Sequence, residues 1–171
     1  MRGKPSENEY GGHFGNYIRL VPEGDIVETL EAQERDTIGL LSGLPESRGD
    51  YRYAEGKWSL KELIGHMTDT ERVMSYRLLR IARGDETPLP GFDQDLWMKH
   101  SVFGGWSFAQ LAEDYGAVRK ATLTLLKGLP EEAWSRRGTA SNVGLTVRAL
   151  AHVIAGHEKH HIAIIRDKYS V

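Results

Sequence analysis

Four long segments of this 171-residue chain carry apolar residues at three- and four-residue intervals, and this spacing constrains the fold more than any other feature. It places the apolar side chains along one face of an α-helix. Helices are expected over residues 25–44, 60–83, 107–127 and 146–168. Only one short piece, near Tyr51 and Tyr53, alternates like a strand, and one such piece does not make a sheet. The sequence therefore predicts an all-α protein, most simply a four-helix bundle.

Capping signals and a long connection refine this prediction. Ser59 is followed by Glu62 and Ser107 by Gln110, the spacing of a capping box at a helix start. The connection over residues 84–106 is rich in Pro and Gly and is too long for a tight turn. It is expected to cross the bundle or to cover a site, so the topology need not be a plain up-down-up-down arrangement.

Composition excludes several classes of function. Lys and Arg number 22 against 24 Asp and Glu, interspersed for a net charge of −2, which argues against a nucleic-acid partner. No run of 18 apolar residues is present, so no membrane partner is expected. The absence of cysteine excludes disulfides and thiolate ligands, and it fits a cytoplasmic location. Residues 1–19 are polar and glycine-rich and are expected to be flexible, with residues 20–171 forming the bundle domain.

The histidines near the C-terminus are the main candidates for chemistry. His157 and His161 belong to an H-E-x-x-H sequence and lie one helical turn apart on the apolar face of the last predicted helix. Each could be a core histidine satisfied by one hydrogen bond. A shared metal ion would satisfy both buried imidazoles at once. His66 is also predicted to lie on the inner side of a long helix, so His66, His157 and His161 are the predicted ligands of one divalent metal ion.

Two other metal-site classes fit the sequence less well. In a metalloprotease, Glu158 would be the general base, but such enzymes take a third ligand from downstream of the motif. Only ten residues follow His161, and none is His or Glu. A di-iron carboxylate bundle needs two Glu-x-x-His motifs. The second helix offers only Glu62 and His66, at four-residue spacing.

Several side chains are candidates for supporting roles around the metal, and none is predicted to be the nucleophile. Glu62 and Asp69 could orient the second ring nitrogen of His66, with a solvated helix face as the alternative for each. Asp95 could bond to a metal-bound water, although aspartates in such loops often form turns. Glu158 and His160 complete this group, with solvent-facing positions as their alternative.

Three stretches, in this order, together resemble the DinB-like superfamily: residues 58–72, 92–97 and 152–161. The resemblance covers about residues 20–168 and implies a four-helix bundle of up-down-down-up connectivity, often a homodimer. It also implies a divalent metal held by three histidines that match His66, His157 and His161. Zinc is the expected ion, with nickel, iron or manganese as alternatives.

The same resemblance suggests three functions. The superfamily includes bacillithiol and mycothiol S-transferases, a thiol-dependent maleylpyruvate isomerase and proteins assigned as metal-dependent hydrolases. The first expectation is an S-transferase that activates a low-molecular-weight thiol for attack on an electrophilic substrate. The alternatives are a hydrolase that activates water on the metal, and a non-catalytic metal-binding bundle associated with stress.

Overall fold

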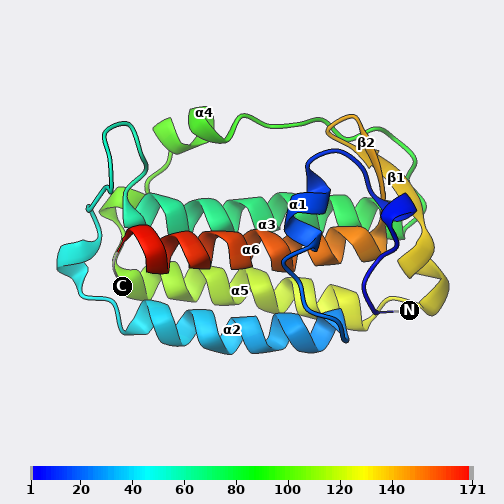
Figure 1. The fold of residues 1–171 in the computed structure, drawn as a ribbon, viewed down its shortest axis with the longest axis horizontal. Helices are drawn as coiled ribbons and strands as arrows, with labels where there is room; N and C mark the ends of the chain where they lie inside the picture. Colours follow the sequence, from blue (N-terminus) through cyan, green and yellow to red (C-terminus); the bar gives the residue numbers. More distant parts are fainter. Residues whose placement is uncertain (1, 170–171) are drawn as a thin grey trace.

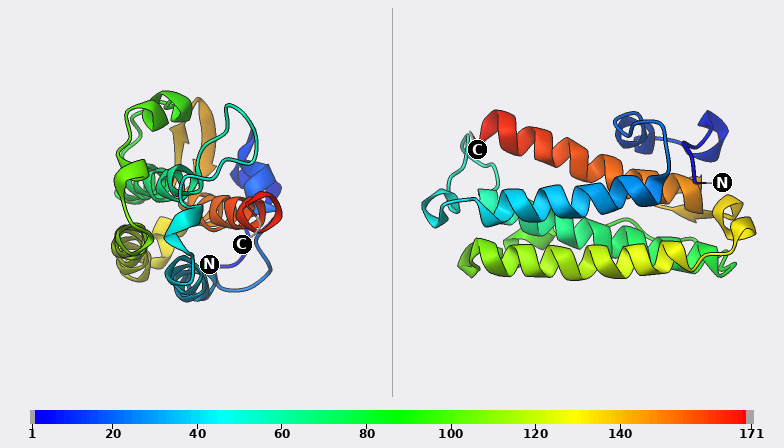
Figure 2. Two further views of the ribbon diagram at one scale, coloured as in Figure 1. Left: turned by 90° about the vertical axis from the view of Figure 1, so that its left-hand side faces the viewer. Right: turned by 90° about the horizontal axis from the view of Figure 1, so that it is seen from below.

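Four long helices form the body of the molecule in the computed structural model, which describes residues 2–169 (Figure 1). Each begins and ends within two residues of the predicted positions. The helix α3 packs on α5 and α6, and α2 packs on the same two helices, as the end-on view in Figure 2 shows. The four helices are α2 (Ile26–Ser42), α3 (Leu60–Ala82), α5 (Phe108–Lys127) and α6 (Val147–Lys168).

The direction of the helices gives the predicted connectivity. In Figure 1, α3 and α5 both run from the left end of the bundle to the right, whereas α2 and α6 run from right to left. The order along the chain is therefore up-down-down-up. This order requires a long connection between α3 and α5, because two parallel helices cannot be joined by a tight turn.

Side-chain caps fix the starts of the helices. The Asp25 carboxylate accepts a hydrogen bond from the Val27 amide at 2.7 Å. Both predicted capping boxes are present, at Ser59 and at Ser107, and the Thr146 hydroxyl accepts from the third residue of α6. These side chains satisfy amide groups that have no partner within the helix.

The connection between α3 and α5 crosses one side of the bundle, as its length predicted (Figure 1). It contains a short helix, α4 (Gln94–Lys99), capped by Asp93, and a single 3-10 turn at Phe103–Gly105. A Cβ atom at Gly65 of α3 would lie 2.1 Å from the ring of Phe103. The aromatic ring therefore packs directly against the backbone of α3 and anchors the end of the connection.

A small β-hairpin was missed by the sequence reading, which predicted no sheet. Strands β1 (Arg137–Ala140) and β2 (Val143–Thr146) pair antiparallel, directly before α6. Ser141 and Asn142 form the two-residue turn, both with positive φ, as a type I′ turn requires. The strands have only four residues each, and Ser-Asn is a weaker hairpin signal than Asn-Gly, which explains the error.

The N-terminal segment, which was expected to be flexible, contains two short helical elements in its described part. Residues 2–19 include a 3-10 turn at Glu7–Glu9 and the short helix α1 (Phe14–Ile18), which packs on α6. Phe14 and Ile18 are buried in the main hydrophobic cluster of the bundle. Two large apolar side chains in an otherwise polar stretch are enough to anchor it.

No helix in the described part of the chain combines the length and the apolar character needed to traverse a lipid bilayer.

Candidate metal centre

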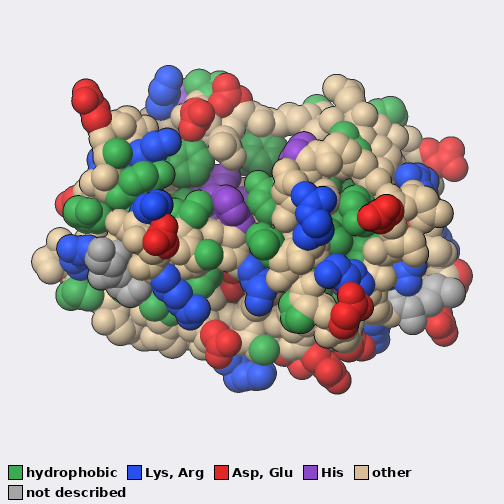
Figure 3. All heavy atoms as spheres, viewed as in Figure 1, with side chains coloured by type: hydrophobic (Ala, Val, Ile, Leu, Met, Phe, Trp, Pro, Cys, Tyr) green, Lys and Arg blue, Asp and Glu red, His purple; other side chains and the backbone are tan. Residues whose placement is uncertain are grey.

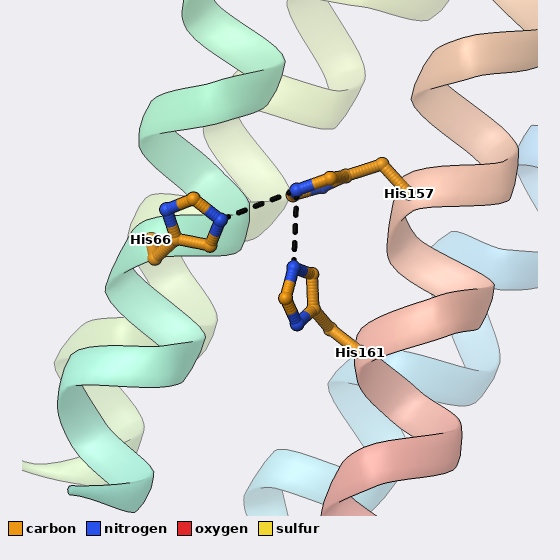
Figure 4. A group of neighbouring side chains, drawn as sticks. All are labelled: His66, His157 and His161. Carbon is orange, nitrogen blue, oxygen red and sulfur yellow. Dashed lines mark hydrogen bonds between the residues drawn. The ribbon is translucent and has the colours of Figure 1, made fainter. Parts of the chain in front are cut away.

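Three histidine rings meet between α3 and α6, about midway along the bundle. His66 comes from α3, and His157 and His161 come from successive turns of α6 (Figure 4). The Nε2 atom of His157 is 3.2 Å from Nε2 of His66 and 3.1 Å from Nε2 of His161. All three side chains are buried. The structure thus brings together the three residues that the helical spacing selected, although His66 and His157 are 91 residues apart in sequence.

The geometry matches what a metal ion needs. Two ligands of a tetrahedral zinc ion, each about 2.0–2.1 Å from it, are about 3.3 Å apart. The two Nε2–Nε2 distances, 3.2 and 3.1 Å, are close to this value. One candidate ligand atom from each residue lies within 4.8 Å of the other two. A single ion can therefore be reached by all three rings with small adjustments.

The three imidazoles are held in the neutral form that metal ligation requires. Burial lowers the pKa of His66 to about 4 and that of His161 to about 3, and it lowers the pKa of His157 well below its usual value. A neutral ring nitrogen takes part in only one good hydrogen bond in its plane. Nε2 of His157 faces two other ring nitrogens and cannot satisfy both, and Nδ1 of His161 is buried without a partner. These nitrogens fit a cation better than they fit one another.

Aromatic rings hold two of the histidines in place. The Trp58 ring lies 4.6 Å from the His66 ring, and the Tyr17 ring meets His157 edge-on at 5.3 Å. Tyr17 can come this close because α1 crosses α6 at Gly156, where a Cβ atom would lie 2.1 Å from the Tyr17 carbonyl oxygen. The N-terminal helix therefore forms one wall of the centre, which the sequence reading did not foresee.

The centre opens to the outside through a cavity. This cavity, about 340 Å³ in volume, lies beside α4 and is lined by His161 together with Trp58 and Asp95. Figure 3 shows histidine side chains at the floor of a hollow on this face, with apolar side chains around them. A small molecule could therefore reach an ion held by the three rings.

The supporting residues proposed from the sequence have different environments. Glu62 accepts bonds from the Ser59 amide and from Arg52, so it caps α3, and no hydrogen bond joins it to His66 in the described residues. Asp69 pairs with Arg72, and burial raises the pKa of this carboxyl group. Neither arrangement orients the His66 ring, and for Glu62 the capping box already explains its position.

Two further candidates lie at the edge of the centre. The exposed His160 ring packs against His161 at 4.9 Å and against Tyr17 at 5.7 Å. Asp95, in the first turn of α4, lines the cavity that His161 lines. Of the predicted supporting residues, Asp95 is thus the carboxylate that faces the space above the triad.

Glu158 is neither solvated nor directed at the histidines, contrary to both expectations. Its carboxylate is buried about 100° around α6 from His157, where it forms an ion pair with Arg119. It also accepts hydrogen bonds from the hydroxyls of Tyr115, at 3.0 Å, and Thr37. A carboxylate with these partners is unsuited to be the general base of a metalloprotease.

Arg119 and Glu71 complete this buried ionic cluster, which the sequence reading missed. Arg119 donates to the two carboxylate oxygens of Glu71 at 2.8 and 2.7 Å, and its side chain has no exposed surface. A signal was present, because Glu71 interrupts an apolar stripe on α3 at the same three- and four-residue spacing as its neighbours. That stripe consists of Leu60, Ile64, Met67, Met74, Leu78 and Ile81.

Other polar side chains of α3 and α6 hold the fold together. Arg77 is buried and donates to the Pro90 carbonyl and, at 3.0 Å, to Ser141, so it ties the crossing connection to the hairpin. Arg80 pairs with Asp85. His152 of α6 is fully buried, and its Nδ1 lies 2.9 Å from the Arg148 carbonyl oxygen.

Together, the fold and the site define a mostly helical protein, a four-helix bundle with a buried three-histidine centre. Comparison with protein families agrees: the family model of the DinB superfamily matches residues 29–165. This chain belongs to the DinB superfamily.

Individual relatives are similar to this chain in sequence or in structure. The chain is 26% identical over 153 residues to the Oceanobacillus iheyensis protein named "Putative metal-dependent hydrolase OB0413", covering 82% of this chain and 79% of the relative. Among solved structures it is similar to YfiT from Bacillus subtilis, described as "a probable metal-dependent hydrolase with an unusual four-helix bundle topology". That match has a TM-score of 0.74 at 18% identity and covers 83% of this chain and 82% of YfiT.

A second structural likeness is to a mycothiol-dependent maleylpyruvate isomerase. The TM-score is 0.63 at 16% identity, with 80% of this chain and 58% of the isomerase covered. At these identities both structural matches establish the fold, and they confirm the predicted DinB-like four-helix bundle.

Proposed function

We propose that this protein is a metal-dependent hydrolase in which His66, His157 and His161 hold one divalent ion. The observation that carries the proposal is the convergence of three buried, neutral imidazoles, one of which, His161, lines an open cavity. Three neutral ligands leave the ion its full charge and at least one free coordination position, which is typical of catalytic zinc sites. The names of the O. iheyensis relative and of YfiT support the same class of reaction.

The ion would supply acidity, since zinc held by such ligands lowers the pKa of a coordinated water to about 7. The side chains around the ion would orient its ligands and provide a proton acceptor. Trp58 and Tyr17 restrict the ring orientations of His66 and His157. Asp95 lines the cavity, and within the described residues no hydrogen bond occupies its carboxylate oxygens. It is placed to accept a proton from a molecule bound above the triad.

Zinc is the proposed ion. Three imidazoles bind zinc well, and they also accept nickel, iron and manganese, so availability in the cell contributes to which ion is bound.

Hydrolysis of activated esters and amides tests this proposal. Metal-free protein, prepared without an affinity tag, would be reloaded with zinc, nickel, manganese or iron(II) and assayed on a panel of small substrates. We expect hydrolysis that requires the ion and is lost in His66→Ala. The matched control is His160→Ala, which removes an exposed histidine beside the triad and is expected to retain activity. Equal rates in the two variants would count against the proposal.

Thiol transfer is the second candidate, and it was the first expectation from the sequence. The likeness to the mycothiol-dependent isomerase favours it, because the two chains share the bundle. A thiol coordinated to the ion would be acidified as water is, and the chain, lacking cysteine, would take the thiol from a cosubstrate. Conjugation of monochlorobimane to a panel of small thiols separates the candidates: transfer without hydrolysis would replace the first proposal by the second.

A further inference from the structure

The cavity above the triad continues into a second hollow. The inner cavity begins at His161, and the outer one, about 470 Å³ in volume, extends to Lys99 at the end of α4. The two share Lys57, Trp58 and Asp95 in their walls. The two hollows are therefore adjacent, and we treat them as one groove, in which a molecule whose reacting group lies at the triad would extend past Trp58 toward the outer hollow.

The inner half of the groove is suited to an apolar, ring-sized group. Its walls include Tyr53, Leu63, Ile164 and Tyr169. The Tyr169 hydroxyl donates to the Trp58 carbonyl at 2.7 Å, so this wall offers a ligand no free phenol group. The volume, about 340 Å³, lies at the lower end of the range for small-molecule pockets, about 300–1,000 Å³.

The outer half has an excess of positive charge. Arg52 and Glu62 neutralise each other through two hydrogen bonds, at 2.7 and 3.2 Å. Arg52 also donates to the Lys57 carbonyl at 2.7 Å, which braces this part of the wall. The remaining charges are two cations, Lys57 and Lys99, against the single anion Asp95. Neither lysine has an ion-pair partner within the described residues.

The geometry points to a substrate that carries a ring-sized apolar body next to its reacting group and a carboxylate at its far end. The apolar body occupies the inner cavity beside Trp58, and Lys57 and Lys99 hold the carboxylate at the outer rim. This inference rests on the proposed function, because it places the reacting group at the metal centre. It adds the chemical class of the substrate, which neither the fold nor the triad specifies.

Aromatic hydroxamates provide a direct test, because the hydroxamate binds the ion and the ring then lies in the groove. The probes are benzohydroxamates that carry, opposite the hydroxamate, a carboxylate separated from the ring by zero to three methylene groups. The uncharged carboxamides of the same lengths are the reference compounds. Dissociation constants would be measured by calorimetry on metal-loaded protein, with metal content checked after each titration.

We expect the best carboxylate to bind about 5-fold more tightly than its carboxamide at low salt, the size expected for two partly exposed charge pairs. This preference should shrink as ionic strength rises. In the double variant Lys57→Gln/Lys99→Gln, the ratio of the two dissociation constants, carboxamide to carboxylate, should fall to about 1. Lys120→Gln, which removes an exposed lysine of α5 outside the groove, should leave it unchanged.

Two results would overturn the inference and leave the metal site standing: equal affinities of carboxylate and carboxamide at every length, or a preference that persists in the double variant. Failure of every hydroxamate to bind is a distinct result. With the ion still bound, it would show that the ion has no coordination position open to the groove, and it would overturn both the proposed function and this inference.

Discussion

Two buried polar clusters meet at consecutive residues of α6, and they differ in how far their members satisfy one another. His157 belongs to the triad, and the next residue, Glu158, belongs to the ionic cluster with Arg119 and Glu71. In the ionic cluster, Arg119 donates to both carboxylates and to the Leu30 carbonyl. Its members need no further partner.

The triad is the opposite case. Its rings are neutral, and the nitrogens that face one another cannot all be satisfied by hydrogen bonds. Buried polar groups without partners are costly, so such a cluster persists where it has another use. The comparison indicates that the ionic cluster serves the fold and that the triad serves a ligand. The following predictions test this division, beginning with the largest expected effect.

Removing one triad ring should abolish stoichiometric metal binding. In His66→Ala we expect the metal content to fall from about one ion per chain to nearly none, because two imidazoles give a much weaker site than three. Loss of an outer partner alone costs about 10–100-fold in affinity, and loss of a ligand should exceed this. Elemental analysis of tag-free protein measures the effect, with His160→Ala as the control that keeps its ion. Equal metal content in the two variants would show that the triad is not the site.

Removing the cation of the ionic cluster should instead lower the free energy of unfolding of the protein. Arg119→Met leaves Glu71 and Glu158 buried without their partner, and the expected loss in the free energy of unfolding is about 3–5 kcal/mol. Urea denaturation of the metal-free protein measures it. The matched control, Lys127→Met, breaks the exposed pair with Glu31 and should cost at most about 1 kcal/mol. Similar losses in both variants would contradict the structural role of the cluster.

Acid should destabilise the metal-free protein through the triad. The pKa of His66 is about 4 in the folded chain and near 6.5 when unfolded, so below pH 6.5 the unfolded chain takes up a proton that the folded chain does not. Stability is therefore expected to fall as pH decreases from 6.5 toward 4, by about 3 kcal/mol from His66. Urea midpoints across this range should show a weaker slope in His66→Phe. An unchanged slope would mean that the ring is not buried in the neutral form.

Replacing the carboxylate of Glu158 while keeping its size should change stability more than activity. Glu158→Gln turns a fully bonded carboxylate into an amide beside Arg119, at a cost of about 1–3 kcal/mol. Hydrolysis by the folded variant should stay within about tenfold of the native rate. Asp95→Asn, in the cavity, should lower it by about 100-fold or more if that carboxylate accepts the proton. If initial-rate assays instead show the larger loss of hydrolysis in Glu158→Gln than in Asp95→Asn, the general base would be Glu158.

The sequence predicted the four long helices and the three histidines because both depend on one periodicity. Apolar spacing defines a helix face, and the same wheel places His157 and His161 on that face. The periodicity does not predict contacts between distant segments. Those it missed are α1 against Gly156, the crossing connection beside the triad, and the pairing of Arg119 with two glutamates. Glu158 was misplaced because a wheel gives direction and does not show which neighbouring helix fills that direction.

Anomalous X-ray diffraction from crystals of the tag-free protein, recorded on both sides of the absorption edge of the ion found by elemental analysis, tests the central claim most directly. The prediction is a single strong anomalous peak about 2.0–2.1 Å from a ring nitrogen of each of His66, His157 and His161. A peak bound elsewhere, or no peak at the point where the three rings meet, would contradict it.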